Sequence, residues 1–227
     1  MAWIMDFYRS ALGKKAVMAI TGAFLFAWVF AHMLGNLKLY LGAEHLNEYA
    51  VWLKNLGAPL LPYKFGLWIS RVLLIVAGWL HIQSATQLTL MNLAARPTGY
   101  ASRDYPAAGY ASRTMRWGGV IVGLFVIYHL LHLTVGAHVL PVKFDEGDVY
   151  HNVVAGFQVW WVSAIYIVAN LALGLHLYHG LWSMFQSLGL SSTTFNPWRR
   201  NFAIVFAAVI TLVNVSFPVA VMTGVVK

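Results

Sequence analysis

The sequence contains no cysteine. Disulfides, cysteine-ligated iron–sulfur clusters and covalently attached c-type haem are therefore excluded from this chain. Charged residues are also scarce, because they make up 10% of the 227 residues, against roughly 25% in soluble domains. The composition is that of a membrane protein, and any redox centre within it would have to be held by histidine or lie on a partner.

Hydrophobic residues make up 60% of the chain and gather in long runs. Each run reaches the roughly 20 apolar residues that a helix needs to cross a bilayer. The predicted spans are residues 16–40, 65–91, 117–139, 157–188 and 202–226. Because no soluble domain is left over, the prediction is a single all-α domain over residues 1–227 with five transmembrane helices. The segment between the first two spans is partly amphipathic and is expected to lie on the membrane surface.

The formal charge is +8, an excess that can indicate nucleic-acid binding. Here the basic residues cluster at the ends of the spans, so membrane topology accounts for them and no nucleic-acid partner is expected. With the N-terminus in the cytoplasm, the inner segments carry Arg9, Lys14, Lys15, Arg96, Arg103, Arg113, Arg116, Arg199 and Arg200. The outer segments then carry only Lys38, Lys54, Lys64, Lys143 and Lys227, with Arg71 near the start of the second span. The positive-inside rule therefore predicts a cytoplasmic N-terminus.

Histidine occurs inside each of the first four spans, at His32, His81, His129 and His176. An ionisable side chain is costly at membrane depth, so each is a candidate functional residue. At 1.5 Å per residue, His32 and His129 lie roughly 12–15 Å from the outer surface, and His81 and His176 roughly 24–26 Å. Two depths predict two pairs, and four histidines from four helices are typical of a bundle that binds two haems by bis-histidine ligation. The alternative for each is a hydrogen bond between helices.

Two further histidines, His132 and His179, each follow a proposed ligand by three residues and so lie near the same helix face. Either could contact a haem propionate or a quinone, or make a polar contact between helices. His45, His138 and His151 fall in loops, where a solvated histidine is the default interpretation.

Four short motifs occur in a consistent order along the spans. SALGKKAVMAITG opens the first span, and HMLGN and LGAEHLNEYA contain the patterns His-x-x-x-Asn and Gly-Ala-Glu-x-x-Asn. Arg116 precedes His129 in the third span, and HLYHGLWS in the fourth places Gly180 and Trp182 after His176. Together they resemble the cytochrome b subunit of succinate dehydrogenases and quinol:fumarate reductases, in the type with one five-helix polypeptide and two b haems. The resemblance covers essentially the whole chain, and it favours His129 over His132 and His176 over His179 as ligands.

The resemblance implies a subunit of respiratory complex II in the cytoplasmic (inner) membrane of a bacterium. The chain would anchor a flavoprotein and an iron–sulfur protein on the cytoplasmic face, and the flavoprotein would oxidise succinate. Electrons would pass between the iron–sulfur protein and a quinone, with menaquinone favoured, through the two haems. Some fumarate reductases of this type carry a glutamate, proposed for proton transfer, two residues before the fourth-span ligand. Gly174 occupies that position here, which puts that proton path in doubt.

Quinone chemistry needs hydrogen-bonding groups and a proton donor beside a redox centre. The outer end of the first span supplies them, because Asn36 follows His32 by one helical turn, and Glu44 and Glu48 lie four residues apart just beyond. These residues are the predicted quinone or propionate contacts. The alternative is a hydrated surface helix with ordinary solubilising acids.

Two other functions are compatible with the composition. One is the diheme cytochrome b of a formate dehydrogenase or hydrogenase, although those proteins usually have four helices and place two ligands on one span. The other is a haem-free transporter or membrane anchor. An ion path is disfavoured because, apart from Arg71 near a span end, the spans lack charged residues suited to it.

Overall fold

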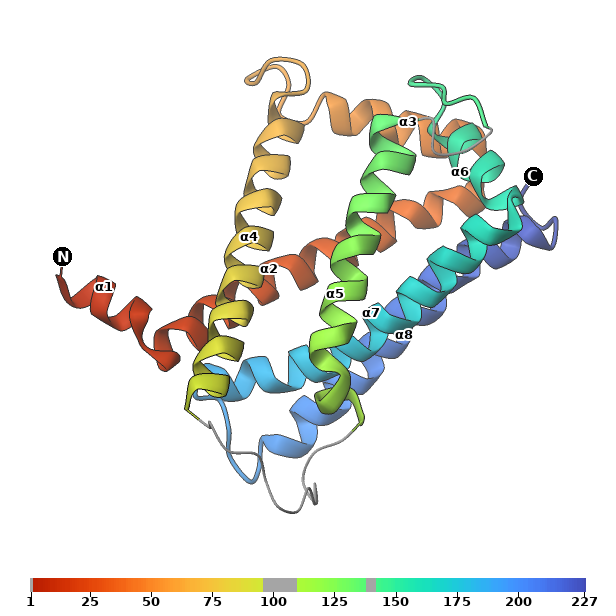
Figure 1. Ribbon diagram of the computed structural model, residues 1–227. Helices are drawn as coiled ribbons and strands as arrows, with labels where there is room; N and C mark the ends of the chain where they lie inside the picture. Colours follow the sequence, from red (N-terminus) through yellow and green to blue (C-terminus); the bar gives the residue numbers. More distant parts are fainter. Residues whose placement is uncertain (1, 96–109, 138–141) are drawn as a thin grey trace.

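The computed structural model of the chain describes residues 2–95, 110–137 and 142–227. Within these ranges the chain is helical and forms no strand, as the long apolar runs predict (Figure 1). The elements are α1 (Ala2–Arg9), α2 (Ala11–Asn36), the 3-10 helix η1 (Leu37–Leu41), α3 (Ala43–Lys54), α4 (Phe65–Ala94), α5 (Tyr110–Leu130), the π-helix η2 (Leu131–Val135), α6 (Val149–Gln158), α7 (Trp160–Ser187) and α8 (Asn196–Met222).

Five helical segments among the described residues are long and apolar enough to cross a membrane. They are Ala11–Leu41, Phe65–Ala94, Thr114–Val135, Trp160–Ser187 and Asn196–Met222. The predicted number and order of the spans are therefore confirmed. The helices α5 and α8 begin earlier than predicted, at residue 110 rather than 117 and at residue 196 rather than 202, because each helix includes basic residues that precede its apolar run.

Two predicted span ends were wrong. The fourth span does not begin at residue 157, because α6 ends at Gln158 and the extended residue Val159 (φ −81°, ψ 108°) separates it from α7. The Ser163 hydroxyl donates to the Phe157 carbonyl at 2.6 Å, which satisfies a carbonyl at this break. The third span ends at Val135 rather than at 139, because Gly136 follows with φ 66°, the left-handed conformation that favours glycine at a helix end.

Helix α7 lies at the centre of the bundle, beside α8, α5 and α2, and α4 packs against α2 (Figure 1). The outer helices α4 and α5 carry large exposed hydrophobic side chains along much of their length. Examples are Trp68, Leu73 and Trp79 on α4, and Trp117 and Leu124 on α5. Apolar surface of this extent is suited to lipid rather than water, so the chain is a multi-pass membrane protein.

Helices α7 and α8 approach one another closely at Gly174. A Cβ atom at this position would overlap the Thr211 hydroxyl oxygen of α8, so a larger residue would need the Thr211 side chain to rotate or the two helices to separate. The absence of a glutamate here is therefore consistent with the close packing of α7 on α8. Gly174 faces α8, and a proton-carrying side chain at this position would have to displace Thr211.

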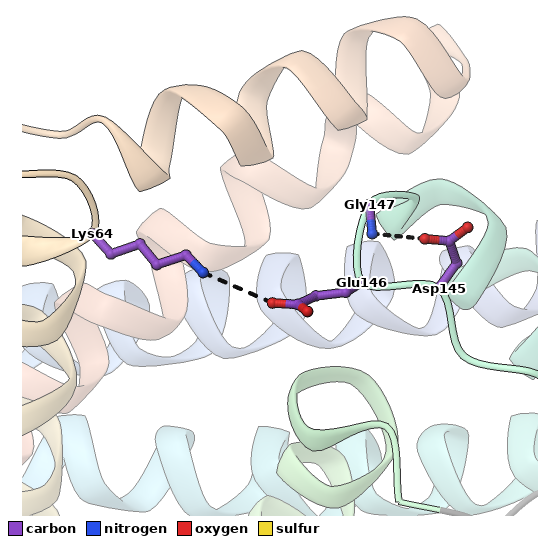
Figure 2. A network of polar contacts seen from close by, with 4 residues as sticks. All are labelled: Lys64, Asp145, Glu146 and Gly147. Atoms are coloured by element: carbon purple, nitrogen blue, oxygen red, sulfur yellow. Dashed lines mark hydrogen bonds and ion pairs between the residues drawn. The ribbon is translucent and has the colours of Figure 1, made fainter.

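One end of the bundle, which we call the α3–α6 end, is held by Asn47. Its side-chain amide donates to Asp148 Oδ1 at 2.9 Å and accepts from the backbone N–H of Tyr150 at 3.0 Å. Figure 2 shows a second contact at this end, where Lys64 Nζ lies 3.8 Å from Glu146 Oε1. The Glu146 side chain is 85% exposed, so this ion pair contributes at most about 1 kcal/mol. The ion pair joins the start of α4 to the loop before α6, whereas the Asn47 bridge links α3 to the start of α6.

The opposite end, which we call the Lys14 end, contains the start of α2 and the end of α4 (Figure 1). The buried Lys14 donates from Nζ to Gln87 Oε1 at 2.6 Å, which ties these two helices together. Its ammonium group also lies over the Tyr8 ring, 4.5 Å from the centroid. A buried lysine therefore has both a polar partner and an aromatic face at this end.

Candidate functional site: two histidine pairs inside the bundle

The structure brings the four predicted histidines together as two pairs. The ring centroids of His32 (α2) and His129 (α5) lie 5.8 Å apart, with an angle of 81° between the ring planes. Those of His81 (α4) and His176 (α7) lie 6.3 Å apart at 65°. The pairing predicted from depth along the spans is therefore confirmed, whereas haem ligation by these residues stays a prediction.

Both separations suit a metal held between two imidazoles. Because a histidine nitrogen binds a transition metal at about 2 Å, two rings on opposite sides of one metal have centroids about 6 Å apart. Among the described residues there is no group of three or more histidine, cysteine, aspartate or glutamate side chains that could hold a metal ion. Each pair therefore offers two protein ligands, and a metal held between them would need its remaining ligands from a bound cofactor.

The His81 ring is oriented by helix α2. Its Nδ1 lies 3.1 Å from the Met18 carbonyl oxygen and 3.3 Å from Thr21 Oγ1. Since the Thr21 hydroxyl donates to the Val17 carbonyl at 2.7 Å, His81 Nδ1–H donates to Met18, and its Nε2 keeps a free lone pair. A metal-binding histidine characteristically has this arrangement, with the second nitrogen donating to a carbonyl.

His129 and His132 share one partner, the hydroxyl of Tyr166 on α7. The Tyr166 oxygen lies 3.2 Å from His129 Nδ1 and 2.9 Å from His132 Nδ1. His132 is buried and lies against α6, where a Cβ atom at Gly156 would be 2.6 Å from His132 Nε2. His132 was predicted to contact a haem propionate or a quinone, or to make a polar contact between helices. The structure shows the last of these, a contact between η2 and α7. Tyr166 was missed by sequence reasoning, because a single tyrosine in an apolar span carries no distinguishing signal.

His176 differs from the other three in its surroundings. Its Nδ1 is buried and has no hydrogen-bond partner within the described part of the chain. Gly119 of α5 faces the ring, since a Cβ atom there would lie 3.5 Å from His176 Cε1. A buried ring nitrogen without a partner is costly for an isolated chain, which makes this pair a candidate site for a bound group.

His179, one turn after His176, lies beside Trp182, with ring centroids 6.4 Å apart. Trp182 is also next to Arg199 of α8, whose guanidinium carbon lies 5.8 Å from the Trp182 ring centroid. Arg199 is only 4% exposed, and one of its terminal nitrogens donates to the Trp182 carbonyl at 3.4 Å. Its Nε has no partner, and among the described residues it makes no ion pair. A buried, unpaired cation points to an anionic partner. From the sequence, Arg199 served only to predict membrane topology and was not identified as a candidate binding residue.

The predicted quinone contacts lie at the α3–α6 end, but they are not equivalent. Glu48 lines an open pocket of about 370 Å³ together with Lys38, His45, Tyr49 and Trp52. Glu44 and Glu48 are both exposed, but Glu44 lies outside this pocket, and Asn36 is half-buried at the end of α2. The Tyr49 ring covers Gly35, where a Cβ atom would lie 2.7 Å from it, so the pocket adjoins α2 close to His32.

The fold and these pairs define a class, the multi-pass helical membrane proteins with paired histidines between their spans. Comparison with known protein families gives a more specific assignment. The family described as "Succinate dehydrogenase/Fumarate reductase transmembrane subunit" matches residues 102–215 of this chain. The chain belongs to this family. The match includes His129 and His176, one member of each pair. No curated protein and no solved structure matches the chain.

Family membership makes this protein a membrane anchor subunit of a succinate dehydrogenase or fumarate reductase complex. It also argues against the alternative of a formate dehydrogenase or hydrogenase cytochrome.

Proposed function

We propose that this subunit passes electrons between an iron–sulfur protein and a quinone, and that it binds two b haems to do so. His32 and His129 would hold one haem, and His81 and His176 the other. The observation that carries this proposal is the pairing itself, since four histidines from four helices meet as two pairs at about the spacing that a shared metal requires.

The chain's own residues would bind, orient and shield the two groups. Haem, when bound, supplies the one-electron chemistry that the side chains of this protein lack. His81 has its Nδ1–H engaged by the Met18 carbonyl, which fixes the ring and leaves Nε2 for the metal. His32 is exposed at the surface of the isolated chain, and the other three histidines of the pairs are half-buried. In the membrane, lipid together with the apolar side chains of the spans would exclude water from both pairs, so that the imidazoles stay neutral and able to ligate.

Haem also carries two carboxylates, and these need a cation or hydrogen-bond donors when they leave water. Arg199 is such a cation, buried and without a carboxylate partner among the described residues. We propose that Arg199, together with His179 beside the same tryptophan, neutralises the anionic edge of the group held by His81 and His176. His132 is engaged by Tyr166, so it is less suited to this role.

Quinone would bind at the α3–α6 end, in the pocket that contains Glu48. The pocket combines a carboxylate, a lysine and two aromatic rings, which are the groups that a quinone headgroup needs for proton supply and stacking. In a bacterial inner membrane with the N-terminus inside, this end faces outward. Protons would then exchange with the outside while electrons arrive from the cytoplasmic partners, the flavoprotein and iron–sulfur subunits. By family likeness, the quinone would be menaquinone.

A reduced-minus-oxidised spectrum of the purified complex tests the haem proposal. We expect a b-type signal equivalent to two haems per chain, with flavoprotein and iron–sulfur subunits copurifying. If the partners copurify without any b-type band, the chain is an anchor that does not carry electrons, and the proposal is wrong.

Accessible reporters test the orientation. Labels at residues 96–113, of which 96–109 lie outside the described residues, should react from the cytoplasm, and labels at 145–148 should react from outside. The reverse pattern would move the quinone pocket to the cytoplasmic side, and it would overturn the assignment of the two ends to membrane faces.

A further inference from the structure

The Tyr166 hydroxyl lies between two imidazoles in the middle of the bundle. Its oxygen is 3.2 Å from Nδ1 of His129 and 2.9 Å from Nδ1 of His132. The Tyr166 side chain is only 5% exposed, and His132 only 7%. Water is therefore a poor alternative partner, and the three polar groups depend on one another.

The direction of each hydrogen bond follows from the proposed function. If His129 binds a metal through Nε2, its Nδ1 carries the proton and donates to the Tyr166 oxygen. Tyrosine has a single hydroxyl proton, which it then donates to His132 Nδ1. His132 is therefore the neutral form with a free lone pair on Nδ1, and the three groups form a chain that runs from the proposed ligand to His132.

Packing on every side fixes the position of this hydroxyl. The Tyr166 ring makes edge contacts with Phe157 at 4.8 Å and Phe125 at 5.0 Å between ring centroids. His132 is held against Gly156 of α6 by the π-helical turn η2, a type of turn that occurs often at functional sites. The chain of hydrogen bonds therefore belongs to the fixed core of the protein.

The other histidines of the two pairs have different surroundings. His81 donates to a backbone carbonyl, and His176 Nδ1 has no partner among the described residues. Of these three, His129 has a side-chain hydroxyl as the nearest partner of its Nδ1, whereas the nearest partner of His81 Nδ1 is the Met18 carbonyl. The Tyr166 hydroxyl is itself polarised by a further histidine, His132.

We propose that Tyr166 is a positioning residue for His129 that, together with His132, lowers the redox potential of the metal held by His32 and His129. This inference rests on the proposed function. An imidazole whose Nδ1–H donates to an oxygen is more basic at Nε2, and a more basic ligand favours the oxidised metal. Because the Tyr166 proton is donated to His132, the Tyr166 oxygen becomes a better acceptor, since hydrogen bonds in a chain strengthen one another.

The test is a redox titration of the complex carrying Tyr166→Phe, with Tyr128→Phe as the matched control. Phenylalanine preserves the packing at position 166 and removes only the hydroxyl. Tyr128 lies in the same cluster, 6.1 Å from the Tyr166 ring and 5.9 Å from the His132 ring, but its hydroxyl has no hydrogen-bond partner within the described ranges. We expect Tyr166→Phe to raise one of the two midpoint potentials and leave the other unchanged, and Tyr128→Phe to change neither.

A second variant, His132→Leu, keeps the inference testable if Tyr166→Phe assembles poorly. It removes the acceptor of the Tyr166 proton, so the same potential should rise, but by less than in Tyr166→Phe. In the double variant, His132→Leu should add nothing to the effect of Tyr166→Phe. Two haems with unchanged potentials in Tyr166→Phe or in His132→Leu, or an equal shift in Tyr128→Phe, would overturn the inference and leave the proposed function intact. A wild-type complex without b-type absorption would instead overturn the proposed function.

Discussion

The Nδ1 atom of His81 on α4 lies 3.1 Å from the carbonyl oxygen of Met18 on the neighbouring helix α2. This contact joins the middle of α4 to α2 and leaves Nε2 as the ring nitrogen with a lone pair. The ring of His176, the other member of the pair, is 6.3 Å away between centroids. A hydrogen bond between two spans therefore fixes which nitrogen of a proposed metal ligand is left for the metal.

Replacing any one of His32, His81, His129 or His176 with alanine should remove one haem from the complex, because the metal at that site loses a protein ligand. Replacing His132 or His179 should leave two haems per chain. The measurement is the pyridine haemochrome content per chain of the purified complex. A variant of His132 that loses a haem, while the His129 variant keeps both, would reverse the assignment of the third-span ligand.

Glutamine at Glu48 should slow electron exchange with quinone analogues at least tenfold, because the carboxylate that lines the pocket can no longer supply a proton. Glutamine at Glu44, an exposed residue outside the pocket, provides the matched control and should have little effect. Haem content and succinate oxidation with artificial acceptors should be normal in both variants. Equal, unchanged quinone kinetics would place the quinone site away from this pocket.

Changing Arg199 to glutamine should weaken retention of one haem by roughly tenfold or more, since charge-assisted hydrogen bonds contribute about 1.5–3 kcal/mol. Arg200, the exposed neighbour of Arg199, is the natural control. Thermal loss of the b-type signal in detergent measures the effect, and Arg199→Lys should restore part of it because the charge is kept. If Arg199→Gln retained both haems as well as Arg200→Gln does, the guanidinium would have no role at the anionic edge.

Asp148 caps helix α6 and accepts from the backbone N–H of His151 at 2.8 Å. This N–H, followed by the Asn47 amide, lowers the pKa of the Asp148 carboxyl. The folded pKa is thus below the unfolded one, so the stabilisation is complete above the unfolded pKa of about 4 and is lost as the pH falls through the lowered folded value. Replacing Asp148 with alanine should destabilise the first turn of α6 by about 1 kcal/mol at neutral pH.

Hydrogen exchange of the α6 amides, compared with wild type at each pH, measures this effect. The difference should be largest at neutral pH and should disappear in strong acid. Alanine at Glu146, whose side chain is 85% exposed, is the control and should leave α6 unchanged. A Glu146 variant that exchanges as fast as the Asp148 variant would show that the loop as a whole, and not the cap, stabilises α6.

The number of spans and the histidine pairs could be predicted because both depend on distance along a helix. Apolar length gives the spans, and the depth of each histidine gives its partner. The contacts of Tyr166 and Arg199 could not be predicted in this way. They depend on how each helix is rotated about its axis, and a span that is apolar on every side has no periodic pattern to fix that rotation.

The break between α6 and α7 could not be predicted from the sequence either. Val159 is β-branched and lies in a mostly apolar stretch where Gly156 precedes the predicted start and no proline marks a break, so the prediction began the span at residue 157. In the structure the Ser163 hydroxyl donates to the Phe157 carbonyl across the break. A serine inside an apolar span is not a recognised signal for a break in the helix, so the sequence did not reveal it.

Helix α4 differs from the other spans in how it is held. Its extensive helix contacts are with α2 and α3, and much of its surface is apolar and exposed. Across the bundle it meets α7 through the rings of His81 and His176. A group bound between these rings would therefore add a direct cross-link between α4 and α7, two helices that otherwise meet mainly through α2. Binding of that group would then stabilise the position of α4 in the bundle, because ligand binding to the folded state adds to its stability.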